Sequence, residues 1–196
     1  LAVLAIAALF YNIGFFVLLA FSPFPLGFGA MGIGLTFFGW GVALAVTSVW
    51  VAPLLLRGMK RSTAMLLVLP LLAIDLVVAG LVVGSPAALV TCIIVGGLLL
   101  GLMNTILTES VMEATDLPRS VASSAYSAVR FLGGAAAPPI AAALWHAFNA
   151  SVPFWFAAAS VVLSALVILL GRPALKRIDE HEADAAEEAE SVLIGD

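Results

Sequence analysis

Charged residues divide this chain into three long apolar stretches. Residues 1–56 carry no formal charge, Asp75 is the only charged residue in 62–108, and Arg130 is the only one in 120–171. A helix needs about 20 apolar residues to cross the hydrocarbon core of a bilayer. Each stretch is therefore long enough for two such helices joined by a short turn, so the pattern predicts six membrane-spanning helices.

Helix-breaking residues locate the turns inside these stretches. The segments are FSPFPLGFG at 21–29, VGSP at 83–86 and FNASVP at 148–153. We therefore expect an all-α membrane protein with a transmembrane unit at 1–171 and a tail at 172–196. The expected spans are 1–21, 30–56, 62–83, 86–114, 119–147 and 152–171.

The composition agrees with a membrane location. Hydrophobic residues make up 63% of the chain and charged residues 10%, against roughly 45–50% and 25% in an ordinary soluble domain. A water-soluble fold of this length has no way to bury so much apolar surface. The lipid bilayer is therefore an expected partner, and nucleic acid is not.

The basic residues predict which way the helices run. Apart from Arg130, every Lys and Arg lies near 57–61, at Arg119 or in the tail, and none lies in the three turns above. Because Lys and Arg are retained on the cytoplasmic side, we expect a multi-pass protein of the inner or plasma membrane with a cytoplasmic carboxyl end.

Both ends of the sequence carry a further expectation. Leu1 starts an apolar run without a basic flank or a secretory cleavage site, which indicates a fragment beginning inside a helix. The tail 172–196 has three basic residues followed by many acidic ones. It lacks the apolar residues to fold alone, so we expect a solvated, partly helical or disordered cytoplasmic end.

The most unusual residue of the chain is Arg130, because an unpaired guanidinium in lipid costs roughly 3 kcal/mol or more. It lies eleven residues after Arg119, about 16 Å along a helix, near the centre of the bilayer. Arg130 continues a polar or small stripe with steps of three and four, formed by Ser120, Ser123, Ser127, Arg130 and Gly134. This position predicts either a water-filled transport path or a buried ion pair.

A second candidate face lies on the fourth span. Gly97 and Gly101 form a small-xxx-small pair, whose expected role is helix contact, and Asn104 (or Thr105) and Thr108 continue the face. Glu109 follows these residues and is the candidate ion-pair partner of Arg130.

Aromatic and polar side chains in the first, second and fifth spans are candidates for binding an apolar ligand, although helix packing uses the same residue types. These candidates are Tyr11, Asn12, Phe15, Phe16, Thr36, Phe37, Trp40 and Tyr126.

Asp75 in the third span is the other intramembrane charge, five residues after Pro70. A buried carboxylate there is able to carry a proton, and it is equally able to serve as a capped or paired structural group. The sequence leaves both roles open. Cys92, the only cysteine, is expected to be a small buried hydrophobe.

Two sequence motifs resemble those of the major facilitator superfamily. VAPLLLRGMKRSTAML is similar to its basic loop pattern G-x-L-x-D-R-x-G-R-R at Leu54, Arg57, Lys60 and Arg61. Alanine, leucine and methionine replace the pattern's first glycine, its aspartate and its second glycine. Within 123–142, a degenerate copy of the antiporter pattern G-x-x-x-G-P-x-x-G-G is formed by Gly133, Ala137, Pro138, Ala141 and Ala142.

The chain as a whole resembles the carboxy-terminal six-helix half of bacterial twelve-span drug/proton antiporters. The resemblance implies that the first, second, fourth and fifth helices line a central cavity, while the third and sixth pack outside. It favours Asn12, Trp40, Asn104 and Arg130 as cavity residues and disfavours Asp75. It also implies an amino-terminal half of six further helices, which would hold the proton-carrying group.

The sequence therefore predicts a secondary transporter that exports hydrophobic or amphipathic small molecules in exchange for protons. The alternatives are the same fold carrying a polar metabolite, and a membrane scaffold or sensor without transport. We expect no enzyme, because His146 lies at the outer end of the fifth span and its serines at the inner end. No cofactor or metal is expected either, because the histidines and the cysteine are scattered.

Overall fold

The protein is represented by a computed structural model that describes residues 1–115 and 118–194, with side chains as far as residue 175. All regular secondary structure in this part of the chain is helical. Six segments are long and apolar enough to cross a membrane, so the predicted all-α membrane fold is confirmed. These segments are Ala2–Leu26, Ala30–Gly58, Arg61–Leu81, Pro86–Glu113, Arg119–Ala147 and Val152–Leu175.

The first two spans are each made of more than one helix. α1 (Ala2–Phe21) is followed by one turn, α2 (Pro23–Leu26), which ends at Gly27 in the left-handed conformation at φ 62°. The remaining elements are α3 (Ala30–Val46), the π-helical segment η1 (Thr47–Val51), α4 (Ala52–Gly58), α5 (Arg61–Leu81), α6 (Pro86–Glu113), α7 (Arg119–Ala147) and α8 (Val152–Ile194).

The sequence predicted one regular helix for the second span, whereas the structure has a wide turn at η1. The backbone N–H of Ala52 donates to the carbonyl of Thr47, five residues earlier. Pro53 follows immediately and has no N–H to continue the regular pattern of bonds. The Ser48 hydroxyl donates to the Gly101 carbonyl at 3.1 Å, so a contact with α6 holds the irregular turn.

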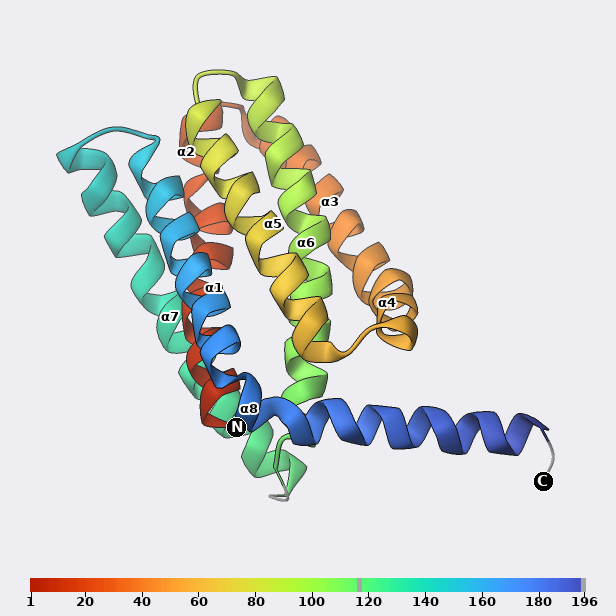
Figure 1. Ribbon diagram of the computed structural model, residues 1–196. Coiled ribbons are helices and arrows are strands. Elements are labelled where there is room, and N and C mark those ends of the chain that lie inside the picture. Colours follow the sequence, from red (N-terminus) through yellow and green to blue (C-terminus); the bar gives the residue numbers. More distant parts are fainter. Residues whose placement is uncertain (116–117, 195–196) are drawn as a thin grey trace.

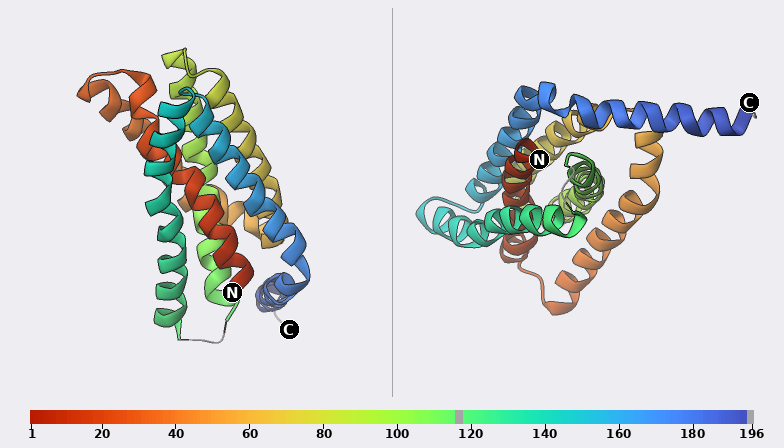
Figure 2. Two further views of the ribbon diagram at one scale, coloured as in Figure 1. Left: turned by 90° about the vertical axis from the view of Figure 1, so that its left-hand side faces the viewer. Right: turned by 90° about the horizontal axis from the view of Figure 1, so that it is seen from below.

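The helices pack in a continuous order, with α3 on α6, α6 on α5, α5 on α8, α8 on α1 and α1 on α7. Figures 1 and 2 show α7 and α3–α4 at opposite ends of this series. These two spans are also the least buried. In each of them 22% of an apolar 18-residue stretch is buried, against 39–56% in the other spans. Apolar side chains such as Met31, Leu35 and Phe38 on α3 and Leu132 on α7 are exposed.

Glycines allow the closest helix contacts. A Cβ on Gly97 would lie 2.6 Å from the backbone oxygen of Trp40, and one on Gly101 would meet the backbone of Leu44. The small-xxx-small pair therefore forms the α3–α6 contact, as predicted.

The basic junction lies beside the carboxyl end of α6. Arg61, the first residue of α5, forms ion pairs with Glu109 and Glu113. Figure 1 shows α8 changing direction and running away from the bundle. Pro173 lies inside this helix. The predicted tail thus continues α8 as a helix to Ile194, and its side chains beyond 175 lie outside the described part.

Candidate functional site

Arg130 lies on α7 between two aromatic rings. Its guanidinium carbon is 5.9 Å from the ring centre of Tyr126 and 5.4 Å from that of Phe131. The Nε atom is buried and has no hydrogen-bond partner among the described residues. A cation over aromatic faces is stabilised by the ring quadrupoles, but this contact leaves the N–H group of Nε without an acceptor.

Asn12 joins α1 to α7 beside this arginine. Its Nδ2 donates to the backbone carbonyl of Arg130 at 2.7 Å. The helices approach closely because Gly133 packs on the backbone of Leu9 and Gly134 on the ring of Phe16. Asn12 is fully buried and its Oδ1 has no partner among the described residues, so only half of its amide is used by the helix contact.

Two tyrosines complete the polar part of the α1–α6–α7 junction. The Tyr126 hydroxyl faces the Arg130 guanidinium and the Thr108 hydroxyl but is outside hydrogen-bond geometry with any described residue. Tyr11 lies close enough to interact electrostatically with Tyr126 and Arg130. Its hydroxyl donates to the Leu100 carbonyl at 3.0 Å, which fixes α1 against α6.

An aromatic network extends from this polar cluster to α3. Ring centres are separated by 6.4 Å for Phe131–Phe16, 5.2 Å for Phe16–Phe15 and 5.8 Å for Phe15–Trp40. Phe37 then lies 6.2 Å from Trp40, whose buried Nε1 has no hydrogen-bond partner in the described part of the chain. The structure therefore brings together most of the aromatic candidates along one path from α7 through α1 to α3.

Three candidate residues use their polar groups within their own helix or leave them unpaired. Thr36 donates to the Gly32 carbonyl at 2.9 Å, and Thr108 donates to the Asn104 carbonyl at 2.7 Å. The Asn104 side-chain oxygen has no partner among the described residues. A contact between these side chains and a ligand stays a prediction.

The expected pairing of Glu109 with Arg130 is not what the structure has. Glu109 lies 3.7 Å from Arg61, which also binds Glu113. Glu109 is on the last turns of α6, and Arg61 begins the neighbouring helix α5. No ion pair of Arg130 occurs among the described residues, so the aromatic rings are its charged group's main contacts there. Arg57 and Lys60 are exposed on the same junction.

Asp75 is buried on the inner side of α5, at 8% relative exposure. Its Oδ2 faces α6 beside Gly96, and the Cys92 thiol is close enough to interact with it electrostatically. Within the described part of the chain Oδ2 has no hydrogen-bond partner and Asp75 has no ion pair. The paired structural role that the sequence left open is thus not formed with these residues.

Sequence reasoning missed Phe131. It follows Arg130 directly, but its exposed apolar ring is an ordinary lipid-facing residue by sequence, and only the structure connects it to Phe16. The described ranges contain no group of three or more His, Cys, Asp or Glu residues placed to hold a metal ion.

Comparison with known proteins adds one relative. The chain is 44% identical over 178 residues to the multidrug efflux protein YfmO of Bacillus subtilis (strain 168). The match covers 91% of this chain and 45% of YfmO, so the chain spans less than half the length of its relative. No protein-family model matches the chain.

This similarity and the six apolar helices characterise the chain as a multi-pass membrane protein related to an efflux protein. The name of YfmO is that of a transport protein and not of an enzyme, which agrees with the sequence prediction.

Proposed function

We propose that this chain is one six-helix half of a secondary transporter of the major facilitator type. It exports hydrophobic or amphipathic small molecules in exchange for protons. An amino-terminal half of six further helices is its partner, and the basic junctions and the carboxyl end lie in the cytoplasm. Similarity to a multidrug efflux protein supports the export of such molecules.

The observation that carries this proposal is the aromatic path from Phe131 through Phe16 and Phe15 to Trp40, with Arg130 at its end. Binding sites for apolar organic molecules combine aromatic walls with a few polar groups that fix orientation. Arg130 Nε, Asn12 Oδ1 and Trp40 Nε1 are among the buried polar atoms here that have no hydrogen-bond partner within the described residues. Buried polar atoms normally have a partner, and a bound cargo or water molecule would supply one.

The proposed movement follows from how unequally the helices are buried. α3 and α7 belong to the two spans with the smallest buried share and carry exposed large apolar side chains, and a second six-helix half would cover them. Rocking of two halves about a site at mid-depth gives alternating access. α1 and α7 would move as one body, because Asn12 and the two glycines of α7 hold them together.

Transport in proteoliposomes tests the proposal. The full-length protein should move a lipophilic cation or a neutral dye against its gradient when a proton gradient is imposed. Flux that does not depend on the proton gradient would contradict the coupling. Absence of any flux from a folded preparation would favour the scaffold or sensor.

The polar-metabolite alternative differs in the polarity of the cargo. Few charged side chains occur in the six spans, which favours apolar cargo. A thermal-shift comparison of lipophilic and polar compounds separates the two, because only a bound ligand stabilises the folded protein.

A further inference from the structure

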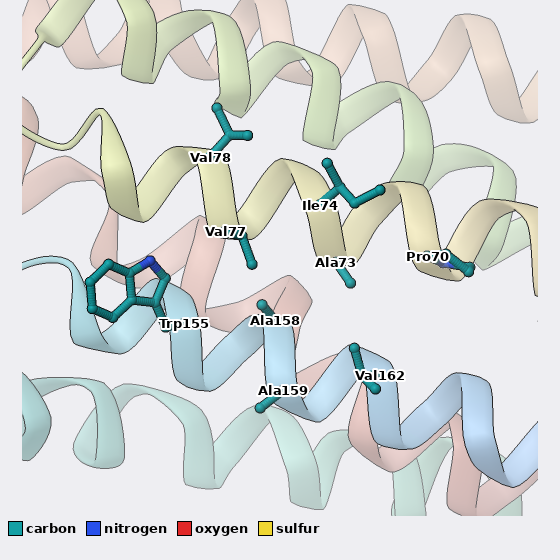
Figure 3. Close-up of a pocket in the computed structure, with 9 residues that line it drawn as sticks. All are labelled: Pro70, Ala73, Ile74, Val77, Val78, Trp155, Ala158, Ala159 and Val162. Carbon is teal, nitrogen blue, oxygen red and sulfur yellow. The ribbon is translucent and has the colours of Figure 1, made fainter.

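A long apolar groove runs along the outer seam between α5 and α8. One part of about 520 Å³ is lined by α5 from Pro70 to Val78 and by α8 from Trp155 to Val162. Figure 3 shows these side chains bordering the seam from the two helices. A second part of about 380 Å³ shares Pro70 and Val162 with the first and continues to Leu66 and Leu169. The two parts therefore form one groove.

Residue spacing explains why the groove is continuous. The lining residues recur at steps of three and four on each helix, so they share one helix face. On α5 these are Leu66, Pro70, Ala73 and Val77; on α8 they are Trp155, Ala158, Val162, Ala165 and Leu169. Alanines on both helices leave the seam wide, and no charged residue lines either part.

Each stripe ends in a polar residue on the basic side of the bundle. Three residues before Leu66 the α5 stripe reaches Thr63, and three residues after Leu169 the α8 stripe reaches Arg172. Arg172 donates from Nη2 to the Thr63 hydroxyl at 3.4 Å. Both residues are exposed, so a cation is positioned at the mouth of an otherwise apolar channel.

We propose that this groove binds an anionic phospholipid, with one acyl chain along the seam and the phosphate at Arg172. The part of the groove nearest Arg172 has the chemistry of such a molecule, with apolar walls that end at a cation. Basic sites between helices at the cytoplasmic side attract anionic headgroups. Arg172 also has the planar donor geometry that suits a phosphate.

The depth of the groove fits the lipid. Arg172 and Val162 are ten residues apart, about 15 Å along a helix, which is half of a hydrocarbon core about 30 Å thick. The part from Arg172 to Val162 therefore spans the leaflet on the Arg172 side. The groove is outside the aromatic path proposed for cargo, so this inference goes beyond the proposed function.

Native mass spectrometry of the full-length protein tests the site with phosphatidylglycerol and phosphatidylcholine that share the same acyl chains. The first retained lipid should be phosphatidylglycerol, favoured about fivefold for one cation near the membrane surface. Arg172→Gln should remove this preference. Arg57→Gln is the matched control, because Arg57 is an exposed cation on the same side away from the groove, and it should leave the preference unchanged.

A second pair of variants tests the apolar part. Val162 and Leu163 are both 45% exposed, but only Val162 lines the groove. Val162→Phe should lower retention of both lipids, whereas Leu163→Phe should not. Equal retention of the two lipids by the wild type, or equal losses from the two Gln variants, would overturn the proposal. The proposal would also be overturned if Val162→Phe kept its lipid but disrupted a dimer of the protein. The same holds if Val162→Phe kept its lipid but lost binding of transported cargo.

Discussion

The α1–α7 seam and the α5–α8 seam differ in where their polar groups lie and in whether these groups have partners. At the first, Asn12 bonds the Arg130 backbone, and Asn12 Oδ1 and Arg130 Nε are left without partners among the described residues. At the second, apolar side chains line the groove from Leu66 to Val78 on α5 and from Trp155 to Leu169 on α8, and the polar pair Thr63 and Arg172 lies at one end. The first seam therefore requires a polar or aqueous partner, whereas lipid is sufficient for the second.

Removing the charge at the first seam should have the largest effect. We expect Arg130→Leu to lower export at least about tenfold, equivalent to about 1.4 kcal/mol, because the cluster loses its cation. Arg130→Lys should be intermediate, since it keeps the charge but not the planar group over Phe131 and Tyr126. Initial rates in proteoliposomes measure this. Wild-type export by a folded Arg130→Leu protein would remove Arg130 from the account.

Asp75 provides the next test, because it lies on α5 but faces away from the apolar groove. Asp75→Asn keeps the shape and removes the ionisable group. We expect gradient-driven export to fall several-fold while ligand binding, followed by thermal shift, stays unchanged. An ionisable group at this depth is costly and is expected to have a functional role. If Asp75→Asn exports as well as the wild type under the same gradient, Asp75 has no role in coupling.

Asn12→Leu should have a moderate effect on stability. Interhelical hydrogen bonds in membranes contribute about 0.6 to 2 kcal/mol, so the free energy of unfolding should fall by about 1 kcal/mol. Titration with a denaturing detergent measures this change. Ser164→Ala is the matched control, because Ser164 donates to the Ala7 carbonyl at 2.8 Å across α8 and α1. An equal loss of stability is expected, with loss of export only for Asn12→Leu.

Filling the second seam should have the smallest effect on transport. We expect Val162→Phe to export within about twofold of the wild type, since the added ring replaces lipid and leaves the polar cluster unchanged. Side-by-side transport rates for Val162→Phe and Leu163→Phe measure this. A strong loss of export in Val162→Phe alone would mean that the groove belongs to the transport path.

The number of membrane spans follows from the sequence, because bilayer thickness sets the length of an apolar span and helix breakers mark the turns. Contacts between distant helices do not. Glu109 pairs with Arg61 and not with the predicted Arg130, because α5 lies beside the end of α6. The η1 turn depends on Pro53 together with Ser48 bonding α6.

The candidate site was predictable only in its residue types. Aromatic residues at mid-depth and a lone arginine indicate binding or packing, and only the fold decides which of them meet. Trp40 packs on Gly97 of α6, and its ring lies beside that of Phe15 on α1. Phe131 joins the network through Phe16 on another helix. Residue spacing within one helix does not predict such a contact.

Thiol labelling of two positions tests the contrast between the seams most directly. The experiment uses a full-length protein in which Cys92 and any other native cysteine are replaced. A charged thiosulfonate reagent reacts only with a thiol that water reaches. Ser127→Cys, on the stripe that carries Arg130, should react and should be protected by a transported compound. Val162→Cys in the apolar groove should stay unmodified. Labelling of Val162→Cys with no labelling of Ser127→Cys would contradict the account.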